Sequence, residues 1–144
     1  MEEIIEAVIF KIGDILCGLD IRHVQEICKN TDITRVYYSP AFISGVINLR
    51  GTVVTVINLR HLFKMKENHR SVTSRIIIVD SGGERIGLLV DIVHDIIEID
   101  RSFLEPPPSN IKGVAGSLFT SIYKKPRELV SIMNLEEVLK IRTE

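Results

Sequence analysis

Histidines and paired carboxylates are the residue types in this chain that could catalyse a reaction or hold a metal. The four histidines form no HxH or HExxH motif and lie at no ligand spacing from a cysteine: His23, His61, His69 and His94. Asp91 and Asp95 are four positions apart, but a lone carboxylate pair after a strand is typical of a solvated face or a helix cap. The sequence therefore predicts no catalytic residue and no metal site.

The two cysteines and the glycines give no sign of a cofactor. Cys17 and Cys28 show neither zinc-site spacing nor a CxxC motif. We interpret them as reduced cytosolic thiols that pack like small apolar residues. The chain has no P-loop, no GxGxxG after a strand and no GxSxG. We expect no bound cofactor and no enzymatic activity.

Arg50 is the residue whose position suggests recognition. It ends an apolar strand and precedes Gly51, which tolerates the positive φ of a tight reversal. An arginine in such a place is often a surface charge that contributes about 0–1 kcal/mol. It can also clamp a partner's carboxylate at the rim of a groove. For Val24 and Glu26 the same two interpretations are open: core packing and a solvated carboxylate, or an interface.

Charge and hydropathy exclude two classes of partner. The net charge is −1, so no general positive field would attract nucleic acid or anionic lipid. No apolar run approaches the roughly 18–20 residues that cross a bilayer. We expect no nucleic acid and no direct membrane insertion.

Turn residues and periodicity predict a mainly β chain. Hairpins are expected around Gly13, Arg50–Thr52 and Ser81–Gly83. Ile21, Val24, Ile27 and Cys28 recur at helical spacing and predict a short helix after the first hairpin. A C-terminal helix is expected over about 135–142, and Asn58 stands where a helix cap is needed. The segments 65–74 and 106–108 read as connectors.

Three similar segments recur in the same order on both sides of the 65–74 connector. ISGV at 43–46 matches IKGV at 111–114, VTVINLRHLFK at 54–64 matches VSIMNLEEVLK at 130–140, and GLDI at 18–21 matches GLLVDI at 87–92. We interpret this as two β units of about 65 residues. Units of this size usually close as barrels. The first is expected over about 7–64 and the second over about 75–134, side by side with a docking cleft at their seam.

The segments DIRHVQEI (20–27), PAFISGVINLRG (40–51), VVTVINLRHLF (53–63) and RIGLLVDIVHDIIEI (85–99) carry a family resemblance. With them the chain resembles CheW, the coupling protein of bacterial chemotaxis, over nearly its whole length. The resemblance implies one CheW-like domain over 1–144, made of two SH3-like five-stranded β-barrels. It implies a cytoplasmic, non-enzymatic adaptor that couples transmembrane chemoreceptors to a CheA-type histidine kinase. An adaptor of another kinase pathway, in pilus motility or gene regulation, is the alternative.

The resemblance also implies partners and a site. Val24, Glu26, Gly45 and Arg50 fall at positions linked to receptor and kinase coupling, and Gly87 matches a glycine of the second barrel. The implied partners are the regulatory domain of the kinase and the cytoplasmic tip of a methyl-accepting chemoreceptor, with barrel contacts that can close into rings at membrane receptor arrays. The first helix and the Arg50 turn would present the groove for the receptor hairpin.

The chain departs from the family pattern at three positions. Thr55 and Asn58 stand where Pro and Asp are common, and Asn134 stands where Asp is common. Asparagine still caps a helical turn, so we expect the fold to be retained.

Overall fold

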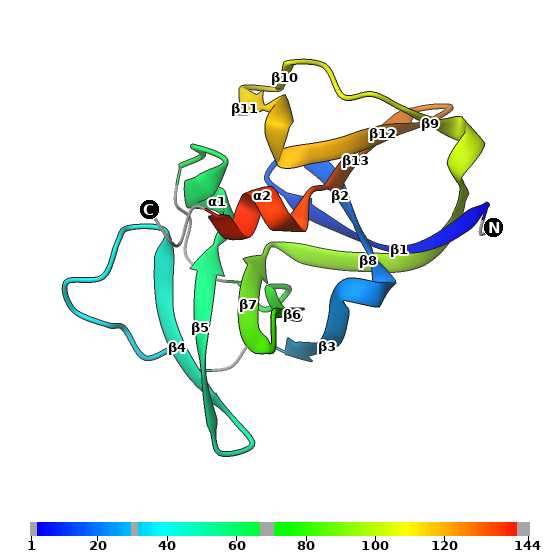
Figure 1. The fold of residues 1–144 in the computed structure, drawn as a ribbon. Helices are drawn as coiled ribbons and strands as arrows, with labels where there is room; N and C mark the ends of the chain where they lie inside the picture. Colours follow the sequence, from blue (N-terminus) through cyan, green and yellow to red (C-terminus); the bar gives the residue numbers. More distant parts are fainter. Residues whose placement is uncertain (1–2, 30–31, 67–70, 141–144) are drawn as a thin grey trace.

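The computed structural model describes residues 3–29, 32–66 and 71–140, and two curled sheets lie side by side in it (Figure 1). The six-stranded sheet has the order β8 (Ile92–Asp100), β1 (Ile4–Ile12), β2 (Ile15–Asp20), β13 (Glu128–Met133), β12 (Phe119–Lys125) and β9 (Leu104–Glu105). The five-stranded sheet has the order β3 (Val24–Lys29), β6 (Arg75–Ser81), β7 (Glu84–Val90), β5 (Thr52–Asn58) and β4 (Ile43–Leu49). The mainly β, two-subdomain prediction is confirmed, with β9 as an extra short strand.

The remaining elements are short. A two-stranded ribbon pairs β10 (Asn110–Ile111) with β11 (Val114–Ala115). In the described residues the helices are α1 (Leu59–Leu62), α2 (Leu135–Lys140) and three 3₁₀ turns: η1 (Ile21–His23), η2 (Arg101–Phe103) and η3 (Gly116–Leu118). The segment 106–108, three prolines, lies outside every helix and strand, because proline cannot donate a ladder hydrogen bond.

All three predicted hairpins form, because each has the turn residues that its geometry requires. Gly13 reverses β1 into β2 with φ 57°, and Gly82 and Gly83 join β6 to β7 with φ 59° and 87°. Positive φ is available to glycine without a steric penalty. These turns hold antiparallel pairs that were readable from local sequence alone.

The two halves of the sequence exchange their first hairpins. The β1–β2 hairpin joins the sheet that contains β13, which runs parallel to β2 with Ile132 opposite Gly18. The β6–β7 hairpin joins the sheet that contains β5, which runs parallel to β7 with Val56 opposite Gly87. Equivalent residues thus meet in both sheets, in agreement with the internal repeat.

This exchange corrects the predicted subdomain boundaries. The ranges 7–64 and 75–134 follow the sequence repeat, but they are not the two sheets, because residues 4–20 pair with the second half and residues 75–90 pair with the first. The physical reason is that each parallel ladder needs a strand from the other half. Parallel strands cannot be joined by a tight turn, so a long connection between them is required.

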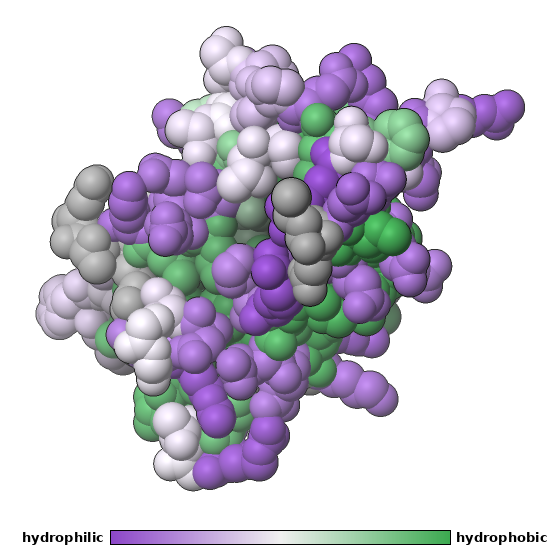
Figure 2. Space-filling view, turned by 45° about the vertical axis from the view of Figure 1, so that its right-hand side comes forward, coloured by the Kyte–Doolittle hydropathy of each residue, from purple (hydrophilic) through white to green (hydrophobic). Residues whose placement is uncertain are grey.

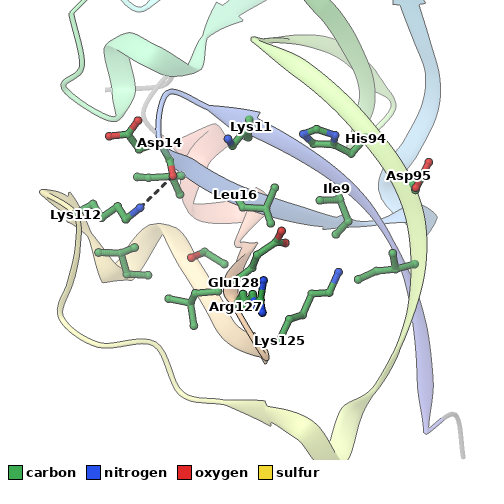
Figure 3. Close-up of a pocket in the computed structure, with 15 residues that line it drawn as sticks. Ile9, Lys11, Asp14, Leu16, His94, Asp95, Lys112, Lys125, Arg127 and Glu128 are labelled. Atoms are coloured by element: carbon green, nitrogen blue, oxygen red, sulfur yellow. Dashed lines mark hydrogen bonds between the residues drawn. The ribbon is translucent and has the colours of Figure 1, made fainter.

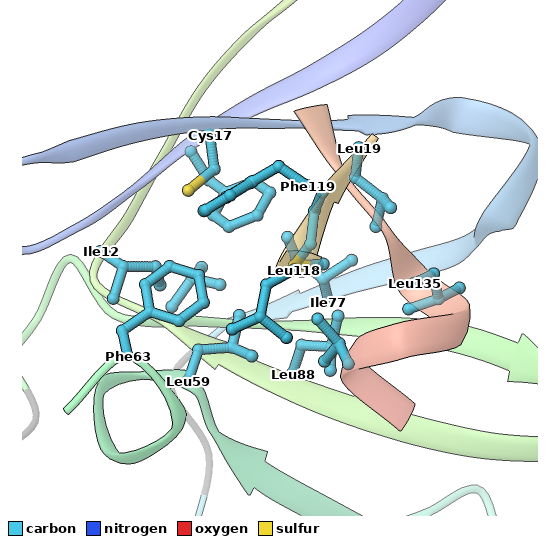
Figure 4. Close-up of a cluster of buried hydrophobic side chains, with 14 of the residues drawn as sticks. Ile12, Cys17, Leu19, Leu59, Phe63, Ile77, Leu88, Leu118, Phe119 and Leu135 are labelled. Carbon is cyan, nitrogen blue, oxygen red and sulfur yellow. The ribbon is translucent and has the colours of Figure 1, made fainter. Parts of the chain in front are cut away.

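A large apolar core fills the space between the sheets (Figure 4). Leu19 and Phe119 contribute from the six-stranded sheet, Ile77 and Leu88 from the five-stranded sheet, and all four are nearly or fully inaccessible to solvent. Phe63 after α1 meets Phe119 edge to face, with ring centroids 5.8 Å apart. Each such side chain contributes about 1.5–3 kcal/mol when buried. The middle of the predicted seam is therefore packed core and not an open cleft.

Each sheet also encloses a smaller apolar cluster of its own. Gly18 and Gly87 lie at equivalent places in these clusters, where a methyl group would crowd a neighbouring isoleucine. An added Cβ would lie 2.9 Å from Ile132 Cδ1 at Gly18 and 2.8 Å from Ile76 Cγ2 at Gly87. Close packing is thus the reason for Gly87.

Asparagine caps both α-helices. Asn58 Oδ1 accepts from the Arg60 backbone N–H at 3.0 Å at the start of α1. Asn134 Oδ1 accepts from the Glu137 backbone N–H at 3.2 Å at the start of α2. The predicted caps are confirmed, so asparagine replaces the family's common aspartate without loss of the helix start. Residues 141–142 of the predicted helix lie outside the described residues.

The predicted helix after the first hairpin is only partly correct. One 3₁₀ turn, η1, follows Asp20, whose side chain accepts from the Arg22 backbone N–H. From Val24 the chain is a strand, because β3 pairs with the edge of β6, with Glu26 opposite Ile78. Side chains alternate between half-buried and exposed along β3, which is the period of a strand and not of a helix.

The equivalence of Gly18 and Gly87 predicts that alanine destabilises the chain at both positions. We expect Gly87→Ala to lower the free energy of unfolding by about 2–3 kcal/mol and Gly18→Ala by about 1–2 kcal/mol. Gly87 is costlier because it faces the Cγ2 branch of Ile76, whereas the Ile132 end near Gly18 can turn away. Urea denaturation measures both values.

Gly82→Asn is the control, because nothing lies within 4 Å of a Cβ there and asparagine tolerates its positive φ. Its effect should stay within about 0.5 kcal/mol. Equal stabilities for all four proteins would contradict the packing role.

Candidate functional site

The predicted site residues all lie on the five-stranded sheet, at its two edges. Val24 and Glu26 are on β3, Gly45 is on β4, and Arg50 is in the turn between β4 and β5. Because β3 and β4 are the outermost strands of that sheet, the residues come from opposite edges. The predicted placement of Val24 and Glu26 on a helix was wrong, but Glu26 still contacts Arg50, because the sheet curls and brings its two edges together.

Arg50 and Glu26 form an ion pair across these edges. Arg50 Nη1 donates to Glu26 Oε1 at 3.2 Å, and Nη2 pairs with Glu26 Oε2. The arginine side chain remains 67% exposed and the glutamate 30%. A pair this open contributes about 0–1 kcal/mol to stability. Both charged groups therefore remain accessible to another molecule.

The β4–β5 turn fixes the direction of Arg50. Arg50 and Gly51 are its two central residues, with φ 51° and 85°, as a type I′ hairpin requires. Asn48 Oδ1 accepts from the Gly51 backbone N–H at 2.8 Å and holds the turn. Left-handed φ is uncommon for a residue other than glycine. Arg50 adopts it here, so the turn carries an arginine at a position where glycine would be the usual residue.

Val24 and Gly45 have structural roles. Val24 is half-buried and packs against the core between the sheets. Gly45 has φ 148°, and a Cβ there would collide with the carbonyl oxygen of Thr34. Thr34 and Val46 exchange backbone hydrogen bonds of 2.8 Å in both directions beside it. Gly45 thus lets the segment before β4 lie directly on that strand.

A second ion pair, between Arg60 and Asp91, was missed by the sequence reasoning. Arg60 Nε donates to Asp91 Oδ1 at 2.9 Å, and Nη2 donates to Oδ2 at 2.6 Å. The Gly13 backbone N–H also donates to Asp91 Oδ2, at 2.8 Å. These bonds to Asp91 raise the pKa of the Arg60 guanidinium. The cluster ties the β1–β2 turn to α1, and so ties one sheet to the other.

The one sequence feature that points to Arg60 is the repeated motif in which it stands. VINLR occurs twice, at 46–50 and 56–60, but the first arginine ends in an open turn and the second in a shared ion pair. Asp91 was interpreted as a cap or a solvated residue, because its partners are 31 and 78 positions away.

A groove of about 640 Å³ opens at one end of the seam between the sheets. We call it the seam groove. Arg22 and His23 of η1 line it, together with Ser81 and Gly82 of the β6–β7 turn and Leu135 and Leu139 of α2. Arg50 is not among its lining residues, which corrects the prediction that η1 and the Arg50 turn form one groove. On the face drawn in Figure 2, apolar surface emerges in separate patches between polar side chains.

The thiols and carboxylates offer little reactive chemistry in the described part of the chain. Burial raises the pKa of the Cys17 thiol, and burial together with the Glu26 carboxylate raises that of Cys28. Over residues 3–29, 32–66 and 71–140, no group of three His, Cys, Asp or Glu side chains is placed to hold a metal ion. His69 lies outside the described residues.

The profile of the CheW-like domain family matches residues 6–142. The chain belongs to this family. The resemblance expected from the PAFISGVINLRG segment and its companions is thereby confirmed.

Similar proteins and a similar structure cover most of the CheW-like chain. A Helicobacter pylori protein named Chemotaxis protein CheW is 32% identical over 139 residues, which is 96% of this chain and 84% of the relative. A Klebsiella aerogenes protein of the same name is 30% identical over 134 residues, covering 93% and 81%. The crystal structure of scaffolding protein TtCheW from Thermoanaerobacter tengcongensis has a TM-score of 0.84 and 37% identity, covering 94% of this chain and 87% of that one.

The helices of the CheW-like chain are short. Among those in the described residues, none has the length and apolar character needed to cross a membrane.

The geometry of Gly45 predicts that this position acts through shape. We expect Gly45→Ala to lower the free energy of unfolding by about 2–4 kcal/mol, because it combines a strained φ with a collision against backbone. Arg50→Gln should cost no more than about 1 kcal/mol, since its ion pair is exposed. Thermal and urea unfolding of the two variants compare these effects. A free energy of unfolding for Gly45→Ala equal to that of the parent protein would refute the structural role of Gly45.

Proposed function

We propose that this chain is a chemotaxis adaptor that couples transmembrane chemoreceptors to a CheA-type histidine kinase and catalyses no reaction itself. Membership of the CheW-like domain family over residues 6–142 carries this proposal. Relatives named Chemotaxis protein CheW, aligned over more than nine-tenths of the chain, support it, as does the similarity to a scaffolding protein. The adaptor works in the cytoplasm and reaches the membrane through its receptor partners.

The Arg50–Glu26 edge is the surface we assign to the kinase. The intramolecular pair is exposed and contributes little to folding. Either side chain can therefore leave this pair and form an ion pair with a partner at a small cost in free energy. A charge-assisted hydrogen bond becomes stronger when an interface excludes water. An arginine aimed by a type I′ turn is suited to be such an anchor, because arginine is enriched among the residues that dominate binding energy.

The position of this pair fits a contact between barrels. Glu26 lies on β3 and Arg50 follows β4, the two edge strands of the five-stranded sheet. Edge strands present unpaired backbone groups that can bind another sheet. The kinase regulatory domain implied by the family resemblance has the same double-barrel fold. A second barrel contact elsewhere on the chain would extend the assembly into a ring.

The seam groove is the surface we assign to the receptor tip. Its floor includes the apolar Leu135 and Leu139 of α2, and its walls come from both sheets. An amphipathic helix binds in a groove of this kind by its apolar face. A receptor helix seated there would contact both barrels at once. The Arg60–Asp91 cluster joins the same two sheets. A movement of one sheet caused by the bound receptor helix would therefore be transmitted to the other sheet and to the proposed kinase contact.

The test separates the partner role of the ion pair from its role in folding. We expect Arg50→Glu to weaken binding to a CheA-type kinase about tenfold or more, with loss of receptor control over kinase activity. Arg50→Glu combined with Glu26→Arg restores an intramolecular pair but reverses both charges, so binding should stay weak. Pull-down and receptor-coupled phosphorylation assays measure both effects.

Arg85→Glu is the matched control, because Arg85 is exposed on β7 of the same sheet and away from both edges. It should bind and couple as the parent does. Parental coupling by Arg50→Glu, or restored binding in the charge-swapped double variant, would show that this edge is not the kinase contact.

A further inference from the structure

A second cavity, unrelated to the surfaces proposed for the partners, lies beside the starts of β2 and β13 (Figure 3). Its volume is about 530 Å³, within the range of roughly 300–1,000 Å³ typical of small-molecule sites. The ladder between β2 and β13 begins at the Cys17–Ser131 pair. Leu16 and Leu129, which come before that pair, line the cavity. It therefore opens where these two strands separate.

The floor of this cavity is apolar. Ile9 of β1, Leu16 of β2 and Ile97 of β8 line it, and all three belong to or pack against the small apolar cluster of the six-stranded sheet. Figure 3 shows Ile9 and Leu16 directed into the space between β1 and the β12–β13 hairpin. Aliphatic walls from three strands favour a branched aliphatic group over a polar one.

A buried hydroxyl lines the same cavity. Ser131 is 1% exposed, and its Oγ makes no hydrogen bond to any residue that the structure describes. Buried polar groups in native structures are nearly always hydrogen-bonded, and an unpaired one calls for an explanation. Ser131 lines the cavity, but its Oγ has almost no accessible surface, so the hydroxyl lies behind the cavity wall and the rim charges are the polar groups that a bound molecule can reach.

Charges of both signs surround the opening. Lys125 and Arg127 come from the end of β12 and the turn after it, while Asp95 and Glu128 come from β8 and β13. All four are exposed, and none forms an ion pair with another residue in the described ranges. By contrast, Lys112 Nζ is engaged, since it donates to the backbone carbonyl of Asp14 at 3.2 Å.

We propose that this cavity binds a small zwitterion with an aliphatic side chain, the chemical class of the aliphatic α-amino acids. The aliphatic group packs on Ile9, Leu16 and Ile97. The ligand's carboxylate lies near Lys125 and Arg127, and its ammonium group lies near Glu128 and Asp95. The rim carries charges of both signs, which are complementary to the carboxylate and the ammonium group of a zwitterion.

The experiment titrates the ¹⁵N-labelled intact chain with four probes and follows backbone amide shifts. The probes are leucine, 4-methylpentanoate without the ammonium, isopentylamine without the carboxylate, and glycine without the aliphatic group. We expect leucine to cause saturable shifts at Leu16, Leu129 and Ser131. Each of the other probes should bind at least about tenfold more weakly than leucine. Failure of leucine to saturate, shifts centred elsewhere, or equal binding of either single-charge probe would overturn the proposal.

Variants test the named contacts in the same assay. Arg127→Gln and Glu128→Gln should each weaken leucine binding about fivefold to tenfold. Lys124→Gln is the control, because Lys124 is next to Lys125 but pairs with Glu105 at 3.6 Å and does not line the cavity. Unchanged leucine affinity in both cavity variants, with dispersed spectra that show the fold is retained, would also refute the site. Neither kinase nor receptor is present, so the result is independent of the proposed adaptor function.

Discussion

The exchange of hairpins between the two halves is the constraint on which the rest of this structure depends. Each sheet takes its central hairpin from the other half of the chain, through the parallel ladders β13–β2 and β5–β7. Gly18 and Gly87 lie in these ladders, where neighbouring isoleucine and valine side chains occupy the space that a Cβ would need. The large core depends on both exchanges, because its members come from both sheets and both helices. Folding of the halves is therefore interdependent.

This constraint also bears on the partner surfaces that we propose. Because the middle of the seam is occupied by core, the proposed partner surfaces lie at the sheet edges and in the groove at one end of the seam. Arg50 and Glu26 lie at the edges of one sheet. The groove draws residues from both sheets. The Arg60–Asp91 cluster, bonded to Gly13, links the sheets near the turn that reverses β1. Two partners on separate surfaces would thus contact one continuous structure.

Features set by neighbouring residues were predictable from the sequence, and features set by distant pairing were not. The hairpins at Gly13 and Gly82 and the cap at Asn58 depend on a few adjacent residues, and all were expected. The β3 strand was expected to be a helix, because only its pairing with β6 makes it extended. The hairpin exchange and the Asp91 cluster link residues tens of positions apart. Arg50 and Glu26 were singled out by family resemblance, but their mutual ion pair depends on the curl of the sheet.

The weakness of the Arg50–Glu26 pair suits an adaptor better than a strong pair would. A buried ion pair resists separation, since removing one partner leaves an uncompensated charge. An exposed pair holds the arginine in position yet yields it to a competing carboxylate at a cost of about 0–1 kcal/mol. The stability of the fold does not depend on it, because the apolar core and the ladders supply that stability. Under the proposed kinase contact, the groups that bind are separate from the groups that stabilise the fold, so partner affinity can change while the scaffold remains intact.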